Sequence, residues 1–297
     1  AVSLLYNGVF WANWENIMAQ EPLGVLCTEI VLNSKTTSFS DVVAGVNQAP
    51  IKAEGASVLR FGPRDGYDVT LTPNTYAIGF STSDEMVQDD LRNTVARQPA
   101  VLAEIMANTI LSTVYALINT AMSSATSPDG QVLISAAHTL AGTSGGTASN
   151  LLGTAADLTE TSLESLIAPM RETTNEDCAF QTLRPSALLV SNTVWGTARK
   201  IAGSATTTLQ GVGESGNAMN AIANAYNLNV IASPRLADTD STILFSDRSP
   251  IALGWRERVN LLPLKRDGDT YSYHQDVKAR WVVKAVDWRG LVGTTGV

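Results

Sequence analysis

Cysteine is scarce in this chain, with only Cys27 and Cys178 among 297 residues. Two cysteines so far apart cannot form the framework of several disulfides that small secreted domains use, and a metal site needs closer ligand spacing. The scarcity therefore excludes a disulfide-stapled fold and a cysteine-based metal site. We expect both thiols to be isolated and buried, as in proteins of a reducing cytosol.

Histidine is equally scarce, with His138 and His274 as its only representatives. Neither belongs to a pair at i, i+4, the spacing that places two imidazoles on one metal ion. A Ser-His-Asp triad also needs a nucleophile elbow between a buried strand and a helix, and we expect none. Both histidines are predicted to be structural. The sequence predicts no catalytic, cofactor-binding or metal-binding residue.

Charge is sparse too, since charged residues make up 16% of the chain against about 25% in an average soluble domain. Small polar residues take their place, which suits a surface covered by neighbours, although many exoenzymes share this composition. The 20 basic and 28 acidic residues give a net charge of −8. Phosphate-driven nucleic-acid binding needs clustered cations, and the basic residues here are scattered. A protein that encloses DNA without binding it tightly could have such an acidic charge balance. Most cytoplasmic proteins have it too, so the charge does not distinguish the two.

One long apolar run, Ala100–Met122, resembles a membrane span in length, with Glu104 as its only charge. Its polar and apolar residues form two separate helical stripes, so we expect an amphipathic helix of a protein that has no membrane partner. The polar stripe is Glu104, Asn108, Ser112, Tyr115 and Asn119, and the apolar one is Met106, Ile110, Val114, Leu117 and Ala121. The chain starts at Ala1, which fits removal of Met or of a propeptide, and Ala1–Trp14 lacks the features of a signal peptide.

Secondary-structure signals change along the chain. Aromatic residues crowd the first 14 positions and predict either an interface or a packed helix. Residues 33–80 are rich in Gly and Pro, with β-branched residues between them, and this pattern predicts a long two-stranded extension that has no hydrophobic core of its own. Two capping boxes predict helix starts, one with Thr82 and Glu85 for a helix from Ser83 and one with Thr161 and Glu164 for a helix from Thr161. Further helices are predicted over Pro99–Ser124, 192–201 and 218–226. Strands are predicted over 131–134, 186–190, 228–232, 242–246 and 276–288.

Gly211–Gly216 matches the dinucleotide-binding pattern Gly-x-Gly-x-x-Gly, and Asp238 lies where a ribose-binding acid would follow. The preceding residues 205–210 are too polar for the strand, buried on both faces, that this site requires, so we expect an ordinary loop. The loop Gly142–Thr147 lacks the Gly-Lys-Ser/Thr ending of a phosphate-binding loop. Asp238 with Asp240 suggests a surface turn, and Glu172, Glu176 and Asp177 suggest a solvated helix end instead of a metal cluster.

Several segments resemble the major capsid proteins of tailed bacteriophages. The central ones are Gln131–His138, Asn150–Leu152, Leu163–Glu164 and Met170–Arg171; the later ones are Pro185–Val190 with its helix, and Arg280–Lys284 followed by Asp287. The motifs are individually degenerate, and the order of the parts adds to them, because it is similar to the Hong Kong 97 capsid fold over nearly the whole chain.

The resemblance implies an α+β fold with four regions. These are an N-terminal arm (1–32), an extended loop (33–80), a peripheral domain with a long spine helix (81–175 and 276–297) and an axial domain (176–275). Some relatives cross-link a loop lysine to a neighbour's asparagine. Lys35 and Lys52 lie in the corresponding segment, but no motif identifies a partner.

The function implied by the resemblance is that of a non-enzymatic major capsid protein. Its copies would form pentamers and hexamers of an icosahedral shell that is assembled in the host cytoplasm and encloses phage double-stranded DNA without sequence-specific binding. Portal, scaffold and decoration proteins are further partners that the resemblance allows. Two alternatives remain at this point: a nanocompartment shell protein, and a nucleotide-dependent enzyme that uses the Gly211 loop.

Overall fold

In the computed structural model, residues 2–296 are described apart from 44–47, 50, 56, 59, 61, 63, 90–93, 142–145, 178, 204–205, 209–216 and 220. The chain divides into two compact units. Unit 1 consists of Ala1–Thr37, Leu71–Ala116 and Ala252–Lys284, and unit 2 of Ser38–Thr70, Leu117–Ile251 and Ala285–Val297. Both units combine helices with strands, so the predicted α+β class is confirmed.

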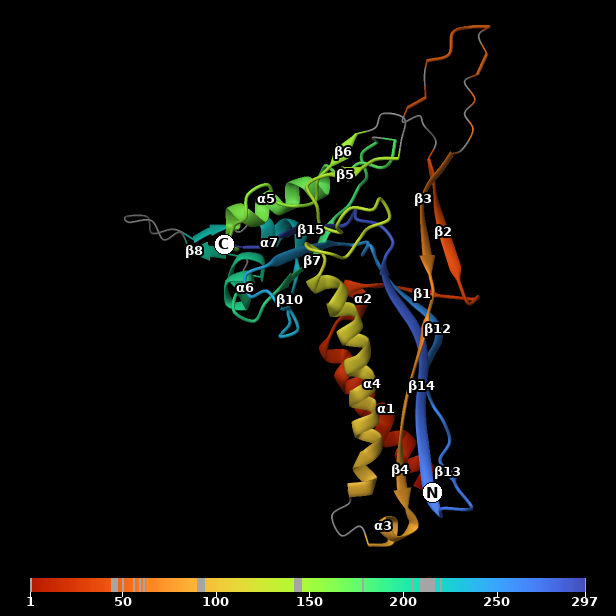
Figure 1. Ribbon diagram of the computed structural model, residues 1–297. Helices are drawn as coiled ribbons and strands as arrows, with labels where there is room; N and C mark the ends of the chain where they lie inside the picture. Colours follow the sequence, from red (N-terminus) through yellow and green to blue (C-terminus); the bar gives the residue numbers. More distant parts are fainter. Residues whose placement is uncertain are drawn as a thin grey trace. The chain divides into compact units, whose positions relative to one another are not determined.

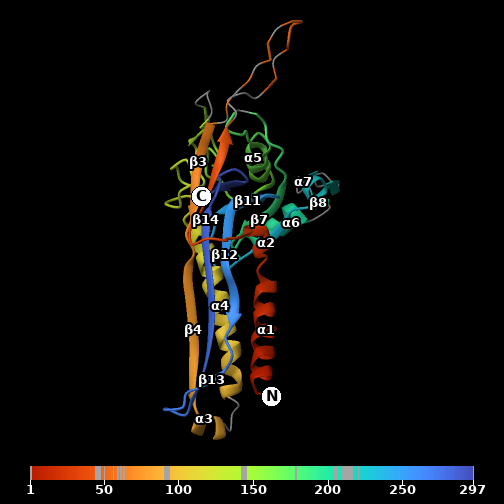
Figure 2. The ribbon, with the colours of Figure 1, turned by 90° about the vertical axis from the view of Figure 1, so that its right-hand side faces the viewer.

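A five-stranded sheet forms the centre of unit 1 (Figures 1 and 2). Its central strand β14 (Ser272–Ala285) pairs antiparallel with β4 (Asn74–Ser83) on one side. The other side of β14 adjoins β12 (Ile251–Leu261) and the short β13 (Lys265–Arg266), and β1 (Thr28–Val31) pairs parallel with β12. The period-2 prediction for this region is confirmed, because Val277, Ala279 and Trp281 are buried on one face of β14.

Two helices, α1 (Val2–Gln20) and α4 (Thr94–Asn119), lie on the same face of this sheet (Figures 1 and 2). Helix α1 buries Tyr6 and Phe10, and Tyr6 meets Phe80 of β4 with ring centroids 6.3 Å apart. Of the two interpretations of the N-terminal aromatics, the packed helix therefore holds for these two side chains. The four-residue helix α2 (Leu23–Leu26) leads from α1 to β1.

Helix α4 differs from its prediction in two respects. It begins at Thr94 and contains Pro99, and it ends at Asn119, whereas the predicted helix ran from Pro99 to Ser124. Tyr115, assigned to the polar stripe, is buried because its hydroxyl donates a hydrogen bond to Glu21 at 2.8 Å. The apolar stripe is confirmed for Met106, Ile110 and Val114. Residues Val95–Asn119 are long and apolar enough to span a membrane by length and composition alone, and half of their most apolar window is buried within the chain.

Both predicted capping boxes lie one or two residues away from the real caps. Helix α3 (Asp84–Gln88) is capped by Ser83, whose Oγ accepts a hydrogen bond from the Met86 amide at 3.3 Å. Thr82 instead donates to Gln98. Helix α5 (Glu160–Arg171) is capped by Thr159 together with Ser162. Thr82 is not the cap because its hydroxyl is engaged with Gln98, and Thr161 is not the cap because it lies inside α5, whereas an N-cap residue has non-helical backbone.

Unit 2 is built on a four-stranded sheet with the order β10-β7-β11-β15. The strands β7 (Pro185–Val190), β10 (Asn229–Ala232) and β11 (Thr242–Ser246) confirm three predicted strands, and β15 (Leu291–Thr294) was not predicted. Helices α5, α6 (Trp195–Gly203) and α7 (Ala221–Tyr226) pack with this sheet around one apolar core. Leu163, Leu188 and Leu244 are fully buried in it.

Three two-stranded ribbons accompany these sheets: β2 (Thr37–Val43) with β3 (Arg64–Leu71), β5 (His138–Thr139) with β6 (Thr147–Ala148), and β8 (Thr206–Thr208) with β9 (Asn217–Met219). The predicted extension over 33–80 is therefore only partly right, since β3 pairs with β2 whereas β4 belongs to the sheet of unit 1. The predicted strand over 131–134 was wrong, because Val132 forms only an isolated bridge with Thr126.

The two units do not coincide with the four predicted regions. Unit 1 takes up residues 252–275, which were assigned to the axial domain, because β12 and β13 adjoin β14. It also contains residues 1–37 together with 71–80, because α1 and β4 pack with the same sheet. The division into arm, extended loop, peripheral domain and axial domain stays a prediction.

Candidate functional site

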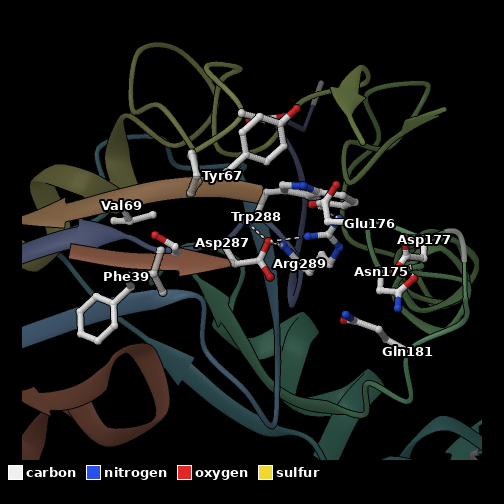
Figure 3. A pocket seen from close by; sticks show the side chains of 14 residues that line it. Phe39, Tyr67, Val69, Asn175, Glu176, Asp177, Gln181, Asp287, Trp288 and Arg289 are labelled. Atoms are coloured by element: carbon white, nitrogen blue, oxygen red, sulfur yellow. Dashed lines mark hydrogen bonds and ion pairs between the residues drawn. The ribbon is translucent and has the colours of Figure 1, made fainter. Parts of the chain in front are cut away.

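The most elaborate polar cluster in the described residues surrounds Trp288 in unit 2 (Figure 3). The His138 ring stacks on the indole with centroids 4.3 Å apart and planes within 4° of parallel. The Arg289 guanidinium lies 4.5 Å from the indole centroid. The Arg289 cation is placed favourably there, because the faces of an aromatic ring carry partial negative charge.

His138 is held at both ring nitrogens. Asp129 lies 2.8 Å from Nδ1, and the side-chain oxygen of Asn150 lies 3.0 Å from Nε2. The Asn150 amide donates to the carbonyl oxygens of Leu133 and Trp288, so its oxygen is the atom that faces the imidazole. Both ring nitrogens therefore have a side-chain partner within the unit. The interpretation of His138 as a structural residue stays a prediction.

Asp129 is the carboxylate that contacts the His138 ring, at 2.8 Å from Nδ1. Burial opposes its ionisation, but hydrogen bonds from the Ser127 hydroxyl, from His138 and from the Gln131 amide hold the pKa of Asp129 below its usual range. The carboxylate also accepts a hydrogen bond from the Thr139 amide. These contacts tie the Ser127–Gln131 turn to β5, and through Asn150 to the segment that contains Trp288.

A buried ion-pair group also adjoins Trp288. Arg289 contacts Glu176 at 2.7 Å and Asp287 at 3.1 Å, and its Nε donates to the carbonyl oxygen of Thr174. The Arg289 and Glu176 side chains are only 5% and 6% exposed. Desolvation raises the pKa of Asp287, although the neighbouring Arg289 acts in the opposite direction. The expectation of a solvated helix end was therefore wrong for Glu176, because Arg289, 113 residues later, neutralises it inside the unit.

A pocket of about 410 Å³ opens beside these ion pairs. Figure 3 shows the side chains of Phe39 and Tyr67, from the β2–β3 ribbon, on one part of its wall and Glu176, Asp287 and Arg289 on another. The carboxylates of Asp129, Glu176 and Asp287 are all engaged in hydrogen bonds or ion pairs within the unit. The cluster therefore joins chain segments that lie far apart in the sequence.

The other predicted candidates do not join this cluster. His274 lies on β14 of unit 1, where its Nε2 is 2.9 Å from the Ser272 hydroxyl. Asp238 and Asp240 lie in an exposed turn, as expected. Lys35 and Lys52 are exposed. Cys27 is buried and free, as predicted, whereas Cys178 lies outside the described residues. Among the residues that the structure describes, no group of three or more His, Cys, Asp or Glu side chains could hold a metal ion.

Two glycine-rich patterns can be judged from the strands beside them. Gly211–Gly216 lies outside the described residues, but the flanking β8 and β9 are antiparallel partners, whereas a dinucleotide site needs a buried parallel strand followed by a helix.

Gly142–Gly146 fits the letters Gly-x-Ser-x-Gly, so the expectation that the sequence contains no such pattern was wrong. Residues 142–145 are not described, and the segment connects antiparallel β5 and β6, which is not the strand-to-helix context of a nucleophile elbow.

Comparison with protein families gives one decisive match. The family model described as phage capsid protein matches residues 66–293, which is more than two thirds of the chain. The chain belongs to the phage capsid protein family. This result confirms the resemblance stated from the sequence, and the capsid protein is a shell-building structural subunit. A search of curated proteins found no match for it.

Solved structures agree with the family assignment at the level of the fold. A chain described as Microbacterium phage Oxtober96 matches with a TM-score of 0.55 and 14% identity, over 93% of this capsid protein and 91% of that chain. The mature capsid of bacteriophage PhiM1 matches with a TM-score of 0.57 and 10% identity, over 91% and 85%. A virus-like particle from Pyrococcus furiosus matches with a TM-score of 0.51 and 9% identity, over 97% and 99%. The capsid protein thus has the Hong Kong 97 type of fold.

Proposed function

We propose that this capsid protein is the subunit that tiles the shell of a tailed phage, as rings of five and six copies around double-stranded DNA. The family match over residues 66–293 carries this proposal. In this role the polar cluster around Trp288 is a structural device that keeps unit 2 rigid, and the protein carries out no chemical reaction. Portal, scaffold and decoration proteins would be partners of the assembled shell, formed in the host cytoplasm.

The β2–β3 ribbon supports self-assembly. An isolated two-stranded ribbon is only marginally stable in water. Between its strands lie Ile51 and Val58, which are 101% and 62% exposed. A neighbouring copy that packs on the ribbon could remove these apolar side chains from water, which is favourable. Exposed apolar residues at the end of the ribbon therefore fit a subunit that binds its neighbours through this ribbon.

The charge supports enclosure of DNA without tight binding. A net charge of −8 repels a polyanion, and scattered basic residues do not form the cation cluster that releases counterions from DNA.

Purification of the expressed protein followed by gel filtration and electron microscopy tests this proposal. We expect closed shells, or rings of five and six copies, in the void volume or as large oligomers. A monomer that persists across salt and pH would contradict assembly. Particles that contain an enzyme in place of DNA, in infected or natural host cells, would favour the nanocompartment alternative. A small oligomer that binds nucleotides would favour the enzyme alternative.

A further inference from the structure

Strand β4 is a long edge strand without the usual protection against pairing. Among the described strands it pairs with β14 alone, in continuous register from Asn74 to Ser83 without a bulge. Figure 2 shows it at the margin of the sheet of unit 1. Its ten residues include no charged residue and no proline. Natural edge strands avoid pairing with other chains by being short, charged, bulged or interrupted by proline, and β4 uses none of these devices.

The other edges of the same sheet are protected. Strand β1 has four residues, of which Glu29 is charged and paired with Arg258. The part of β12 beyond β1 carries Arg256, Glu257 and Arg258 in succession. Strand β13 consists of only two residues, Lys265 and Arg266. The lack of protection on β4 is therefore specific to this edge of the sheet.

Side chains on the inner face of β4 are also incompletely covered. Tyr76, Ile78 and Phe80 face the helices, as do Val277, Ala279 and Trp281 of the neighbouring β14. The β14 residues are fully buried, whereas the three β4 residues are only half-buried. A strand added beside β4 would cover the apolar flank that the subunit leaves open.

We propose that the free edge of β4 pairs with an extended strand of a second copy of this chain during shell assembly. This inference rests on the proposed self-assembly and names one contact that achieves it. In an antiparallel sheet alternate residues direct their backbone N–H and C=O groups to opposite sides, so about half of the ten residues of β4 present these groups outward. A second copy is the occupant because many copies of the chain meet in a shell and no charge on β4 repels them.

Lysine substitutions at exposed positions of β4 test the proposal. The double variant Ala77→Lys/Ser81→Lys gives the edge the charges that protect natural edge strands. The control is Gln20→Lys/Asn260→Lys, which adds the same charge at exposed positions of α1 and β12 in the same unit. We expect the β4 variant to fold, with wild-type circular dichroism and melting temperature, but to yield at least tenfold fewer particles. The control should assemble as the wild type does.

Hydrogen exchange of the β4 amides gives a second, direct measurement. Amides bonded to β14 should be protected in both the unassembled subunit and the particle. The alternate amides should gain at least about a hundredfold protection only in the particle. Equal exchange of those amides in both states, or normal assembly of the β4 variant, would overturn the proposed contact while leaving shell formation intact. Failure of the wild-type chain to assemble would overturn both.

Discussion

Trp281 is the largest side chain that unit 1 buries completely, at 0% exposure. Its ring stacks on Tyr76 of β4 at 3.8 Å and lies 5.9 Å from the ring of Trp255. Three aromatic rings from three strands thus fill the middle of the sheet's inner face. The small neighbours Val277 and Ala279 leave the space that the indole occupies, so truncation would leave a cavity that the strands cannot close.

Truncation of this indole should be far more damaging than truncation on the opposite face. Trp281→Ala is expected to lower the free energy of unfolding by about 3–5 kcal/mol and to give mostly insoluble or unassembled protein. Lys284→Ala, at an exposed position, should cost less than about 1 kcal/mol. Urea unfolding and particle yield measure both variants. Equal behaviour of the two would show that the buried face of β14 is wrongly assigned.

Cys27 predicts an alkaline transition in stability. Burial, with a smaller contribution from Glu29, raises the pKa of its thiol from 9.0 to about 12. The thiol stays protonated in the folded chain but ionises on unfolding, so its stabilising contribution is complete below pH 9 and is lost as the pH rises towards 12. The slope over this range should be about 1.4 kcal/mol per pH unit for the one proton.

Urea unfolding at several pH values between 8 and 11 checks this transition. The variant Cys27→Ala should lose the part of the slope that belongs to one proton, while lysine and tyrosine contributions stay the same in both proteins. Identical slopes would mean that the thiol titrates normally in the folded state and is not buried.

The buried pair Glu176–Arg289 predicts an asymmetry between single and double variants. Arg289→Met leaves Glu176 buried without its cation and should cost about 3–5 kcal/mol, whereas Arg289→Met/Glu176→Met should cost clearly less. The reason is that an unpaired buried charge is more costly than no charge. Chemical unfolding of the three proteins gives the comparison. A double variant as unstable as the single one would indicate that other contacts of Arg289, such as the one with Trp288, dominate.

At the scale of elements, the β2–β3 ribbon combines two roles. Val43, the last residue of β2, and Val69 and Leu71, near the end of β3, are 2%, 4% and 0% exposed. Ile51 and Val58, between the strands, are exposed. The two strands are therefore part of the folded subunit, whereas Ile51 and Val58 are available for contacts with other copies. Removal of the whole stretch Thr36–Pro73 would take away buried residues along with exposed ones.

Replacement of residues 44–63 by Asn-Gly, a dipeptide that closes two-residue hairpins, separates these roles. We expect a subunit with a nearly unchanged melting temperature that no longer forms shells. The matched variant that lacks Thr36–Pro73 should be unfolded or insoluble, because it loses Val69 and Leu71 from the core. Normal assembly of the short-turn variant would show that the connecting segment has no part in contacts between subunits.

At the scale of the whole molecule, the charge balance predicts weak interaction with DNA. The net charge of −8 should keep unassembled subunits from shifting double-stranded DNA in a gel at physiological salt. Binding should stay independent of sequence when salt is lowered. A sequence-specific shift at physiological salt would contradict the proposal that the shell encloses DNA without recognising it.

Much of the architecture could be predicted from local patterns. The alternation in Val277–Trp281 defined the buried face of β14, and the spacing of Met106, Ile110 and Val114 defined the buried face of α4, because side-chain direction repeats with the backbone. Strand β11 over Thr242–Ser246 was predicted to the residue. The scarcity of cysteine and histidine predicted neither a disulfide framework nor a metal site, and this stays a prediction.

The tertiary structure decided the features that depend on partners far apart in the chain. Glu176 was expected to be solvated, and Tyr115 was placed on a polar stripe, because their partners Arg289 and Glu21 lie 113 and 94 residues away. The pairing of β4 with β14 across the subunit could not be inferred either. Hydrophobic periodicity is a local property that the sequence alone determines, whereas the pairing of charges, rings and strand edges depends on which distant segments the folded chain brings together.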